Sequence, residues 1–292
     1  FAHYLEGAET RQNVSSTEFG VSVERVVATE PDLVLAPNAT SVETVETLRD
    51  AGLTVYHFPA ATDFEDVKSK TLTIGQLTGN ERAARETNAW VDANVEAVST
   101  ATADAERPQL MYPLLGGFAV GGDTFINEII VASGAENVVA DDFDGYDQPS
   151  DERVIELDPD VLLVTDQTRG QILGTEPYSL TAAGQANESV FLEVNYINQP
   201  APRSLVYSTR NLTMQLHPDR YDESEFVSRS EAAASLDGSN ATATGTDDSN
   251  ASTDSTADGS PTGVSAPGFG PAVAVLSLLG GSLLARRRSG AA

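Results

Sequence analysis

Apolar and polar positions alternate along residues 1–220 in short blocks that predict strands and helices in turn. Mostly apolar runs, typical of strands covered on both faces, occur at 33–36, 54–58, 109–112, 137–140, 161–164 and 190–196. Residues with helical spacing of apolar positions occupy 41–51, 63–77, 81–102, 123–133 and 202–216. This alternation predicts an α/β fold with parallel sheets and right-handed crossovers.

One unit of this pattern occurs twice. Residues 22–35 match residues 150–163 at seven of fourteen positions, including Ser-x-Glu-Arg-Val and Pro-Asp. Each copy predicts a serine-capped helix, a Pro-Asp turn and a buried strand. Two copies so far apart indicate two similar lobes rather than a solenoid, whose repeats would be contiguous.

The long helix predicted after Gly79-Asn80 separates the two lobes. It would extend roughly 33 Å at 1.5 Å per residue, which is enough to cross from one lobe to the other. We therefore expect an N-terminal lobe over 1–79, an interlobe helix over 80–105 and a C-terminal lobe over 106–228. A Ser/Thr/Asp-rich stalk over 229–266, with no aromatic residue, is expected to be disordered.

The charge balance is strongly acidic. The chain has 44 acidic and 17 basic residues, a formal charge of −27, and only Lys68 and Lys70 as lysines. This composition excludes nucleic acid as a partner and favours adaptation to high salt, where screening reduces self-repulsion. No cysteine is present, so disulfides and thiolate metal sites are excluded.

The C-terminal residues 267–292 combine Pro267-Gly268-Phe269, an apolar run over 271–285 and three arginines. The apolar run predicts a hydrophobic helix, and the arginines after it predict that its C-terminal end is cytoplasmic. Everything upstream of the helix would then lie outside the cell. The Pro-Gly-Phe motif resembles the sorting signal of haloarchaeal surface proteins whose tail an archaeosortase replaces with a lipid. A plain membrane anchor is the alternative. Asn240 and Asn250 are candidate glycosylation sites in the stalk.

Catalytic motifs are not found in the sequence. The glycine-rich loop 115–122 lacks the Lys-Ser/Thr of a phosphate cradle, and Gly-x-Ser-x-Gly is absent. The histidines His3, His57 and His217 are far apart and have no metal-binding context. We therefore expect no catalytic residues, no bound metal site and no cofactor.

Several motifs together resemble the solute-binding proteins of ABC importers for cobalamin and ferric siderophores. They are the repeated Ser-x-Glu-Arg-Val…Pro-Asp segment, residues 123–138, Gln199-Pro-Ala-Pro-Arg203 and Leu216-His-Pro218. The resemblance covers about residues 1–220 and implies two lobes bridged by one rigid helix, with ligand in the cleft between them. The first strand and helix of that family should precede Phe1, so the first lobe is expected to be incomplete.

The resemblance implies roles for particular residues. Glu24 and Glu152 match the glutamates that dock such proteins onto the arginines of the permease; helix capping alone is the alternative. Ligands of open α/β sheets lie at the carboxyl ends of the strands, which selects as ligand contacts Tyr4, Asn38, Tyr112, Leu115, Gly116, Phe118, Arg169 and Tyr196. Ordinary packing is the alternative for each tyrosine.

The predicted function is therefore capture of cobalamin or a ferric siderophore outside the cell, for delivery to an ABC permease and its ATPase. The expected partners are these subunits, the corrinoid or siderophore ligand, an archaeosortase, and the membrane through the tail or a lipid. Two alternatives stay open: a structural or adhesive surface glycoprotein, and an extracellular metal-handling enzyme that would bring His3 or His57 together with carboxylates.

Overall fold

The computed structural model describes residues 7–16, 20–243 and 273–275. The chain divides into two compact units. Unit 1 comprises Phe1–Ala60 with Ser249–Ala292, and unit 2 comprises Ala61–Asp248. The division falls before the helix α3 (Phe64–Thr78), whereas the sequence places it after residue 79. The reason is that α3 packs along α4 (Glu81–Thr102) and so belongs to unit 2.

Unit 1 is a small parallel sheet with two helices. The strands β2 (Val55–His57), β1 (Leu33–Ala36) and β9 (Val273–Val275) lie in that order, and the helices are α1 (Val23–Ala28) and α2 (Val42–Asp50), after the 3-10 turn η1 (Ala8–Thr10). Val34 and Ala36 of β1 pack with Val26, Val45 and Leu48 into one buried cluster. These strands and helices confirm the elements predicted at 33–36, 41–51 and 54–58.

The sheet of unit 2 is parallel throughout, with the order β5-β3-β7-β8. Its strands are β3 (Gln109–Met111), β5 (Glu136–Asn137), β7 (Val161–Val164) and β8 (Ser189–Phe191). The connecting elements are α5 (Phe125–Ala132), α6 (Asp151–Leu157), α7 (Arg169–Ile172), η3 (Tyr178–Leu180), α8 (Ala182–Ala186), α9 (Val194–Ile197) and α10 (Pro202–Leu216). A separate antiparallel pair, β4 (Ala119–Val120) and β6 (Tyr146–Asp147), lies beside this sheet.

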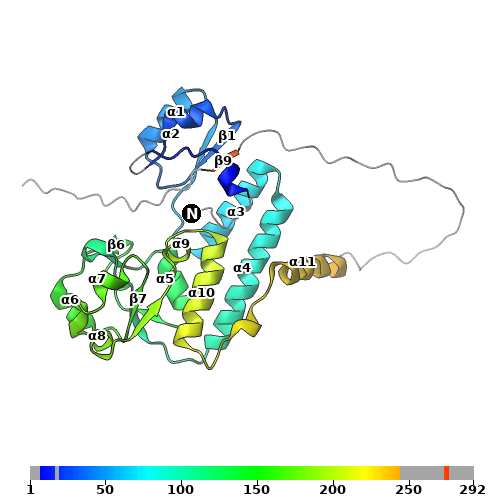
Figure 1. Cartoon of the computed structure of the whole chain (residues 1–292). Coiled ribbons are helices and arrows are strands. Elements are labelled where there is room, and N and C mark those ends of the chain that lie inside the picture. The colour runs from blue at the N-terminus through cyan, green and yellow to red at the C-terminus, as the bar shows by residue number, and fades with distance from the viewer. Residues whose placement is uncertain (1–6, 17–19, 244–272, 276–292) are drawn as a thin grey trace, which may run out of the picture. The chain divides into compact units, whose positions relative to one another are not determined.

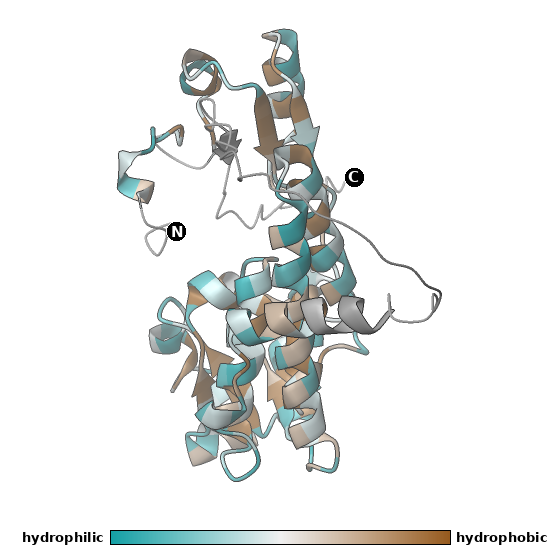
Figure 2. Ribbon diagram, turned by 90° about the vertical axis from the view of Figure 1, so that its right-hand side faces the viewer, coloured by the Kyte–Doolittle hydropathy of each residue, from teal (hydrophilic) through white to brown (hydrophobic). Residues whose placement is uncertain are grey.

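Helices cover both faces of the unit 2 sheet, with α6, α7 and α8 on one side of β7 and α10 and α4 on the other (Figure 1). Successive side chains of a strand point to opposite faces of the sheet, so the core of unit 2 consists of two clusters. Leu110 and Leu163 join the cluster that includes Trp90 and Leu205, while Met111 and Leu162 join a second cluster. Figure 2 shows the apolar residues concentrated on the strands and the inward faces of the helices. Burial on both faces explains why these strands are continuous apolar runs.

The helices α4 and α10 confirm their predicted bounds at both ends. Pro202 is the first residue of α10, where a backbone N–H would have no partner within the helix. The helix α3 ends at Gly79, which is in the left-handed region, and α4 begins two residues later. The expected strand 190–196 is shorter, because β8 ends at Phe191 and Tyr196 lies on α9.

A further helix, α11 (Arg229–Ala243), occupies residues expected to begin the disordered stalk. Ser228 and Glu231 form a reciprocal cap: Glu231 N donates to Ser228 Oγ at 3.3 Å, and Ser228 N donates to Glu231 Oε2 at 2.8 Å. Ala232 is 3% exposed and packs in the core with Trp90. The Ser-x-x-Glu pattern and one small apolar residue thus extend the folded body beyond residue 228.

The described part of the apolar tail is the strand β9, which pairs in parallel with β1 through Leu33–Val273 and Leu35–Val275. The structure therefore differs there from the hydrophobic helix expected over 271–285. Val273 and Val275 are β-branched, and such residues favour a strand. In the described ranges, no helix combines the length and the apolar character needed to cross a membrane. The sorting motif 267–269 lies outside the described residues.

Candidate functional site

The carboxyl edge of the unit 2 sheet gathers the loops that follow β3, β7 and β8. Because the strands are parallel, these loops leave the sheet at the same edge. Leu115, Gly116 and Phe118 belong to the loop after β3, and Arg169 belongs to the loop after β7. The structure thus brings four of the predicted ligand contacts to one edge of one unit.

The loop after β3 is held in a fixed turn. Leu114 N donates to Phe118 O at 2.7 Å, and Gly116 lies between them in the left-handed region with φ of 75°. Gln148 Nε2 donates to Gly116 O at 2.7 Å from the neighbouring loop. Leu115 is left 42% exposed at the tip, so the loop presents an apolar side chain on a rigid backbone.

The glycines at 121 and 122 let a second loop approach closely. A Cβ on Gly121 would lie 2.2 Å from Phe143 O, and a Cβ on Gly122 would lie 2.8 Å from Ala140 O. Gly121 N donates to Gly145 O at 2.8 Å, and Gly122 N donates to Phe143 O at 2.9 Å. The glycine-rich segment therefore serves contact between two loops, which agrees with the absence of a phosphate-cradle motif.

Tyr146 was not selected from the sequence, but it lies on β6 in the loop 141–148 that borders Gly116. The residue is 50% exposed, and burial around its hydroxyl raises its pKa. Pairing of Val120 with Tyr146 brings it beside the glycine-rich segment. The antiparallel pair β4–β6 is formed by two-residue strands without a periodic signal, so the sequence pattern alone could not locate it.

Tyr112 packs inside unit 2, and Tyr196 is partly exposed on α9. Tyr112 is fully buried, its hydroxyl donates to Asn198 Oδ1 at 3.1 Å, and burial raises its pKa above the usual value. The ring of Tyr196 lies 5.2 Å from the ring of Tyr207 on α10. The structure favours the packing alternative for Tyr112, whose side chain is buried, whereas Tyr196 on α9 stays a predicted ligand contact.

Arg169 and Asn38 follow strand ends in their respective units. The loop after β7 is fixed by the buried threonines 165 and 168, since Thr165 N donates to Thr168 Oγ1 at 2.9 Å. Arg169 N donates to Thr165 O at 2.9 Å, and its side chain is exposed. Asn38 is exposed in the turn after β1 of unit 1. Tyr4 lies outside the described residues.

The two described histidines, His57 and His217, belong to no cluster of side chains that could hold a metal ion. His217 is 9% exposed, and its Nε2 lies 3.1 Å from Gly134 O, so it is a packed residue at the end of α10. His57 ends β2 in unit 1, and His3 is not among the described residues. Within the described ranges, no group of three or more His, Cys, Asp or Glu side chains is arranged to hold a metal ion.

A shallow groove of about 350 Å³ lies elsewhere in unit 2, between α3, α4 and α5. It is lined by Phe64, Glu65, Lys68, Val91, Asp92, Val95, Glu96 and Glu128. Glu128 accepts a hydrogen bond from Phe64 N, and desolvation raises its pKa. Lys68 Nζ pairs with Glu65 at 2.6 Å and with Asp92 at 2.7 Å. The groove carries four acidic side chains, unlike the apolar tip of the loop 115–118.

The repeated glutamates occupy the same position on two short helices. Ser22 Oγ accepts from Arg25 N at 3.3 Å to cap α1, and Ser150 Oγ accepts from Arg153 N at 3.2 Å to cap α6. Glu24 and Glu152 are exposed in the first turns. Neither carboxylate has a hydrogen-bond or ion-pair partner in the part of the chain that the structure describes.

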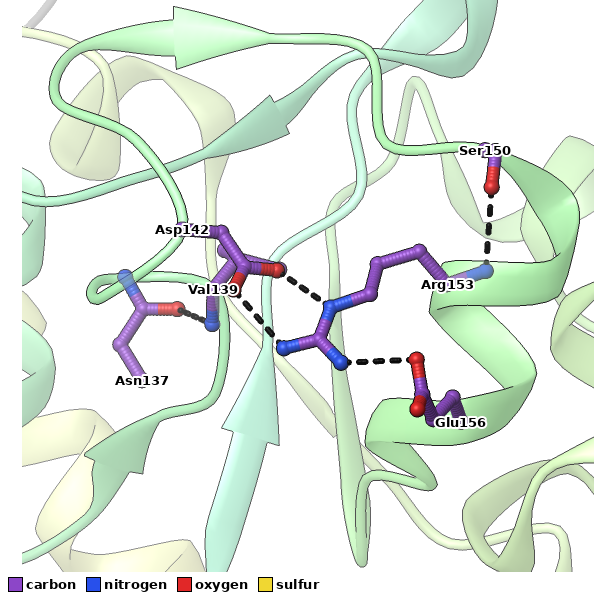
Figure 3. Close-up of polar contacts among 6 residues, drawn as sticks. All are labelled: Asn137, Val139, Asp142, Ser150, Arg153 and Glu156. Carbon is purple, nitrogen blue, oxygen red and sulfur yellow. Dashed lines mark hydrogen bonds and ion pairs between the residues drawn. The ribbon is translucent and has the colours of Figure 1, made fainter.

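The repeated arginines, in contrast, are engaged. Arg153 binds both carboxylate oxygens of Asp142, with Nε–Oδ2 of 2.7 Å and Nη2–Oδ1 of 2.8 Å (Figure 3). Its Nη1 donates to Glu156 Oε2 at 2.9 Å. Arg25 Nη1 donates to Ser15 O at 2.8 Å. Within each Glu-Arg pair, the arginine stabilises the local structure and the glutamate stays available.

The chain is similar to known proteins in sequence and in fold. The family model described as periplasmic binding protein matches residues 12–193. The chain is 40% identical over 217 residues to a cobalamin-binding protein of Halobacterium salinarum, and the match covers 70% of this chain. The same match covers 58% of the relative, so the chain spans less than two thirds of the length of that protein.

Two solved structures share the fold. A periplasmic heme-binding protein of Pseudomonas aeruginosa gives a TM-score of 0.64 at 20% identity, covering 75% of this chain and 83% of that protein. The periplasmic vitamin B12-binding protein of Vibrio cholerae gives 0.61 at 18% identity, covering 75% and 86%. At this level of identity the likeness shows the α/β fold of these proteins and nothing about their ligands.

Proposed function

The chain belongs to the periplasmic binding protein family, and we propose that it is the substrate-binding component of an ABC importer that captures a metal chelate, either a corrinoid or a siderophore-type complex. The observation that carries the proposal is the 40% identity over 217 residues to a protein described as cobalamin-binding. The family match also accounts for the repeat in two lobes, for which an adhesive glycoprotein or a metal-handling enzyme offers no reason.

The carboxyl edge of unit 2 supports a large and partly apolar ligand. Leu115 and Tyr146 are 42% and 50% exposed there. An exposed leucine and an exposed tyrosine suit a macrocycle or another large chelate more than a bare ion.

Delivery requires a contact with the permease, and Glu24 and Glu152 are suited to it. Both carboxylates are exposed on capped helix starts, one in each unit. In concentrated salt the Debye length falls to about 3 Å, so such a contact depends on close hydrogen bonding to cationic groups. The permease and ATPase subunits of an importer are the partners this proposal requires.

The experiment that tests the ligand class is equilibrium dialysis of the full chain in concentrated KCl against cyanocobalamin, hemin and a ferric hydroxamate. We expect saturable binding of cyanocobalamin with one ligand per chain. The variant Leu115→Asp should weaken it, whereas Leu72→Asp on α3, a leucine with similar exposure of 38%, should not. Binding of none of the three chelates would remove the proposed function.

Surface attachment is a separate part of the proposal. Residues 267–269, the apolar run after them and the arginines at 286–288 are the parts of a sorting signal, and the arginines would be lost with the cleaved segment. Mass spectrometry of the native mature protein should find no peptide from residue 285 onward. Recovery of an intact terminus from membranes would favour a retained anchor instead.

A further inference from the structure

The guanidinium of Arg153 connects α6 to the loop 141–148. It reaches back eleven residues to Asp142 and makes two parallel contacts with that carboxylate, at 2.7 and 2.8 Å (Figure 3). A two-pronged contact of a planar guanidinium with a carboxylate fixes orientation as well as distance. The first turn of α6, which carries Glu152, is therefore oriented relative to this loop.

The same loop is bound along its length to the candidate ligand edge. The backbone of residues 121 and 122 pairs with residues 143 and 145, and Tyr146 pairs with Val120. At the end of the loop, Gln148 Nε2 donates to Gly116 O at 2.7 Å, only two residues before the Ser150 cap. One hydrogen bond and a two-residue stretch of backbone thus lead from Gly116 to the helix start that carries Glu152.

The first copy of the repeat has a corresponding contact. Arg25 Nη1 reaches back ten residues to Ser15 O at 2.8 Å. Ser15 pairs with Val21, and Ser22 N donates to Val14 O at 2.8 Å, so the segment before α1 is also folded against it. Capping alone would explain the serine and the glutamate, but it does not explain an arginine that binds the preceding segment in both units.

We propose that Arg153 is a positioning residue: by joining α6 to the loop 141–148 it holds Glu152 in register with the ligand edge, so that a ligand contacting the loop 115–118 changes the presentation of Glu152. Arg25 holds Glu24 in the corresponding way relative to the segment 14–16. The docking role of Glu152 rests on the proposed function, whereas the mechanical connection between α6 and the ligand edge does not.

Arg153 has two carboxylate partners, Asp142 and Glu156. Replacing each in turn separates the positioning role of Arg153 from simple ion pairing. Arg153 also contacts Glu156, which is on its own helix and whose side chain is 72% exposed. Loss of Glu156 removes one ion pair and leaves the link to the loop intact. Loss of Asp142, whose side chain is 25% exposed, removes the link itself. The pair Asp142→Asn and Glu156→Gln is therefore a matched comparison.

The first test follows amide hydrogen exchange in the ligand-free full chain. Asp142→Asn and Arg153→Lys should each speed exchange about fivefold in residues 150–157 and 115–118, the factor expected when one good exposed ion pair is lost. Glu156→Gln should leave both segments unchanged. If residues 115–118 exchange at the native rate in all three variants, the proposed connection between α6 and this loop is wrong.

The second test measures the affinity of the reconstituted permease complex for the same variants, with and without cyanocobalamin. Arg153→Lys should weaken docking about fivefold while its dissociation constant for cyanocobalamin changes less than twofold. Docking of Arg153→Lys with native affinity would overturn the positioning role. A native chain that binds neither cyanocobalamin nor the permease would end the proposed function, and the exchange experiment would still decide the connection.

Discussion

Lys68 and Lys70 are the only lysines in a chain whose formal charge is −27, and both lie on α3. Lys68 pairs with Asp92 on α4 at 2.7 Å. Lys70 Nζ donates to Pro200 O, just before α10, and burial lowers its pKa to about 8. Each lysine thus joins α3 to a different neighbouring element, which explains why these two remain in a lysine-poor chain.

The depressed pKa of Lys70 predicts an unusual pH dependence. The pKa of Lys70 is about 8 in the folded chain and the ordinary lysine pKa is 10.5, so between these values the unfolded chain binds more protons. The free energy of unfolding of the native chain, relative to Lys70→Met, should therefore rise from pH 8 to 10.5 and be constant below pH 8. Urea titrations at fixed KCl concentration measure this difference.

Lys68→Met is the control for that series. The carboxylates of Asp92 and Glu65 raise the pKa of Lys68 against a partial desolvation, so its stabilising contribution persists to higher pH. Its difference curve should not rise between pH 8 and 10.5. A difference curve for Lys70→Met that stays flat across the same range would show that Lys70 is not buried as described.

At the scale of elements, strongly periodic segments were predictable and short ones were not. The helices over 81–102 and 202–216 have their expected bounds because capping, Gly and Pro signals agree with the apolar period. The helix α11 was missed because its composition resembles a linker, although Ser228-x-x-Glu231 is a capping signal. Local composition is a weak guide when a few contacts decide whether a segment packs.

The candidate site was partly predictable for a related reason. The carboxyl ends of the strands identify the ligand-binding edge of the sheet. This rule selected Leu115, Gly116, Phe118 and Arg169 from the sequence. The direction of each side chain depends on the strand period: Leu110 and Tyr112 are two residues apart and both join the core cluster with Trp90. Tyr146 depends on a pairing between distant loops, which a single sequence pattern does not contain.

Attachment of α11 depends on one amide side chain. Asn94 Nδ2 donates to Val227 O at 2.9 Å, and Val227 N donates to Asn94 Oδ1 at 3.0 Å. Trp90 Nε1 donates to the same Val227 O at 2.9 Å. Asn94→Ala leaves the N–H of Val227 unpaired and should lower the free energy of unfolding by about 1–3 kcal/mol.

Limited proteolysis measures the same effect locally. The native chain should resist cleavage through the first half of α11, and Asn94→Ala should be cut after residue 226. Asn80→Ala is a suitable control, since Asn80 is exposed at the start of α4 and its side chain bonds only to Thr78. Identical digestion of the native chain and Asn94→Ala would contradict the role given to this residue.

The exposed glutamates of α1 and α6 give a prediction about docking onto the permease. Replacing both Glu24 and Glu152 with alanine should leave the affinity for cyanocobalamin unchanged and sharply reduce uptake by cells that depend on this protein. Loss of favourable dipole interactions should cost about 0.3–1 kcal/mol of stability per helix. Normal uptake by the double variant at native expression would reduce the repeated glutamates to helix-capping residues.

At the scale of the whole molecule, membership of the periplasmic binding protein family explains the features that recur in both units. Each unit has a parallel sheet, a capped helix with an exposed glutamate, and an arginine that binds the preceding segment. The acidic surface suits a protein that works in concentrated salt, where self-repulsion is screened. The proposed capture function rests on these features and on the link within unit 2 between the candidate ligand edge and α6.

The most direct test of this account is amide hydrogen exchange of the full chain in concentrated KCl, with and without saturating cyanocobalamin. The account predicts that ligand slows exchange in residues 113–118 and 146–148 at the carboxyl edge of the unit 2 sheet, with the groove between α3 and α4 unaffected. Unchanged exchange throughout, or protection confined to that groove at Glu65, Lys68 and Asp92, would contradict it.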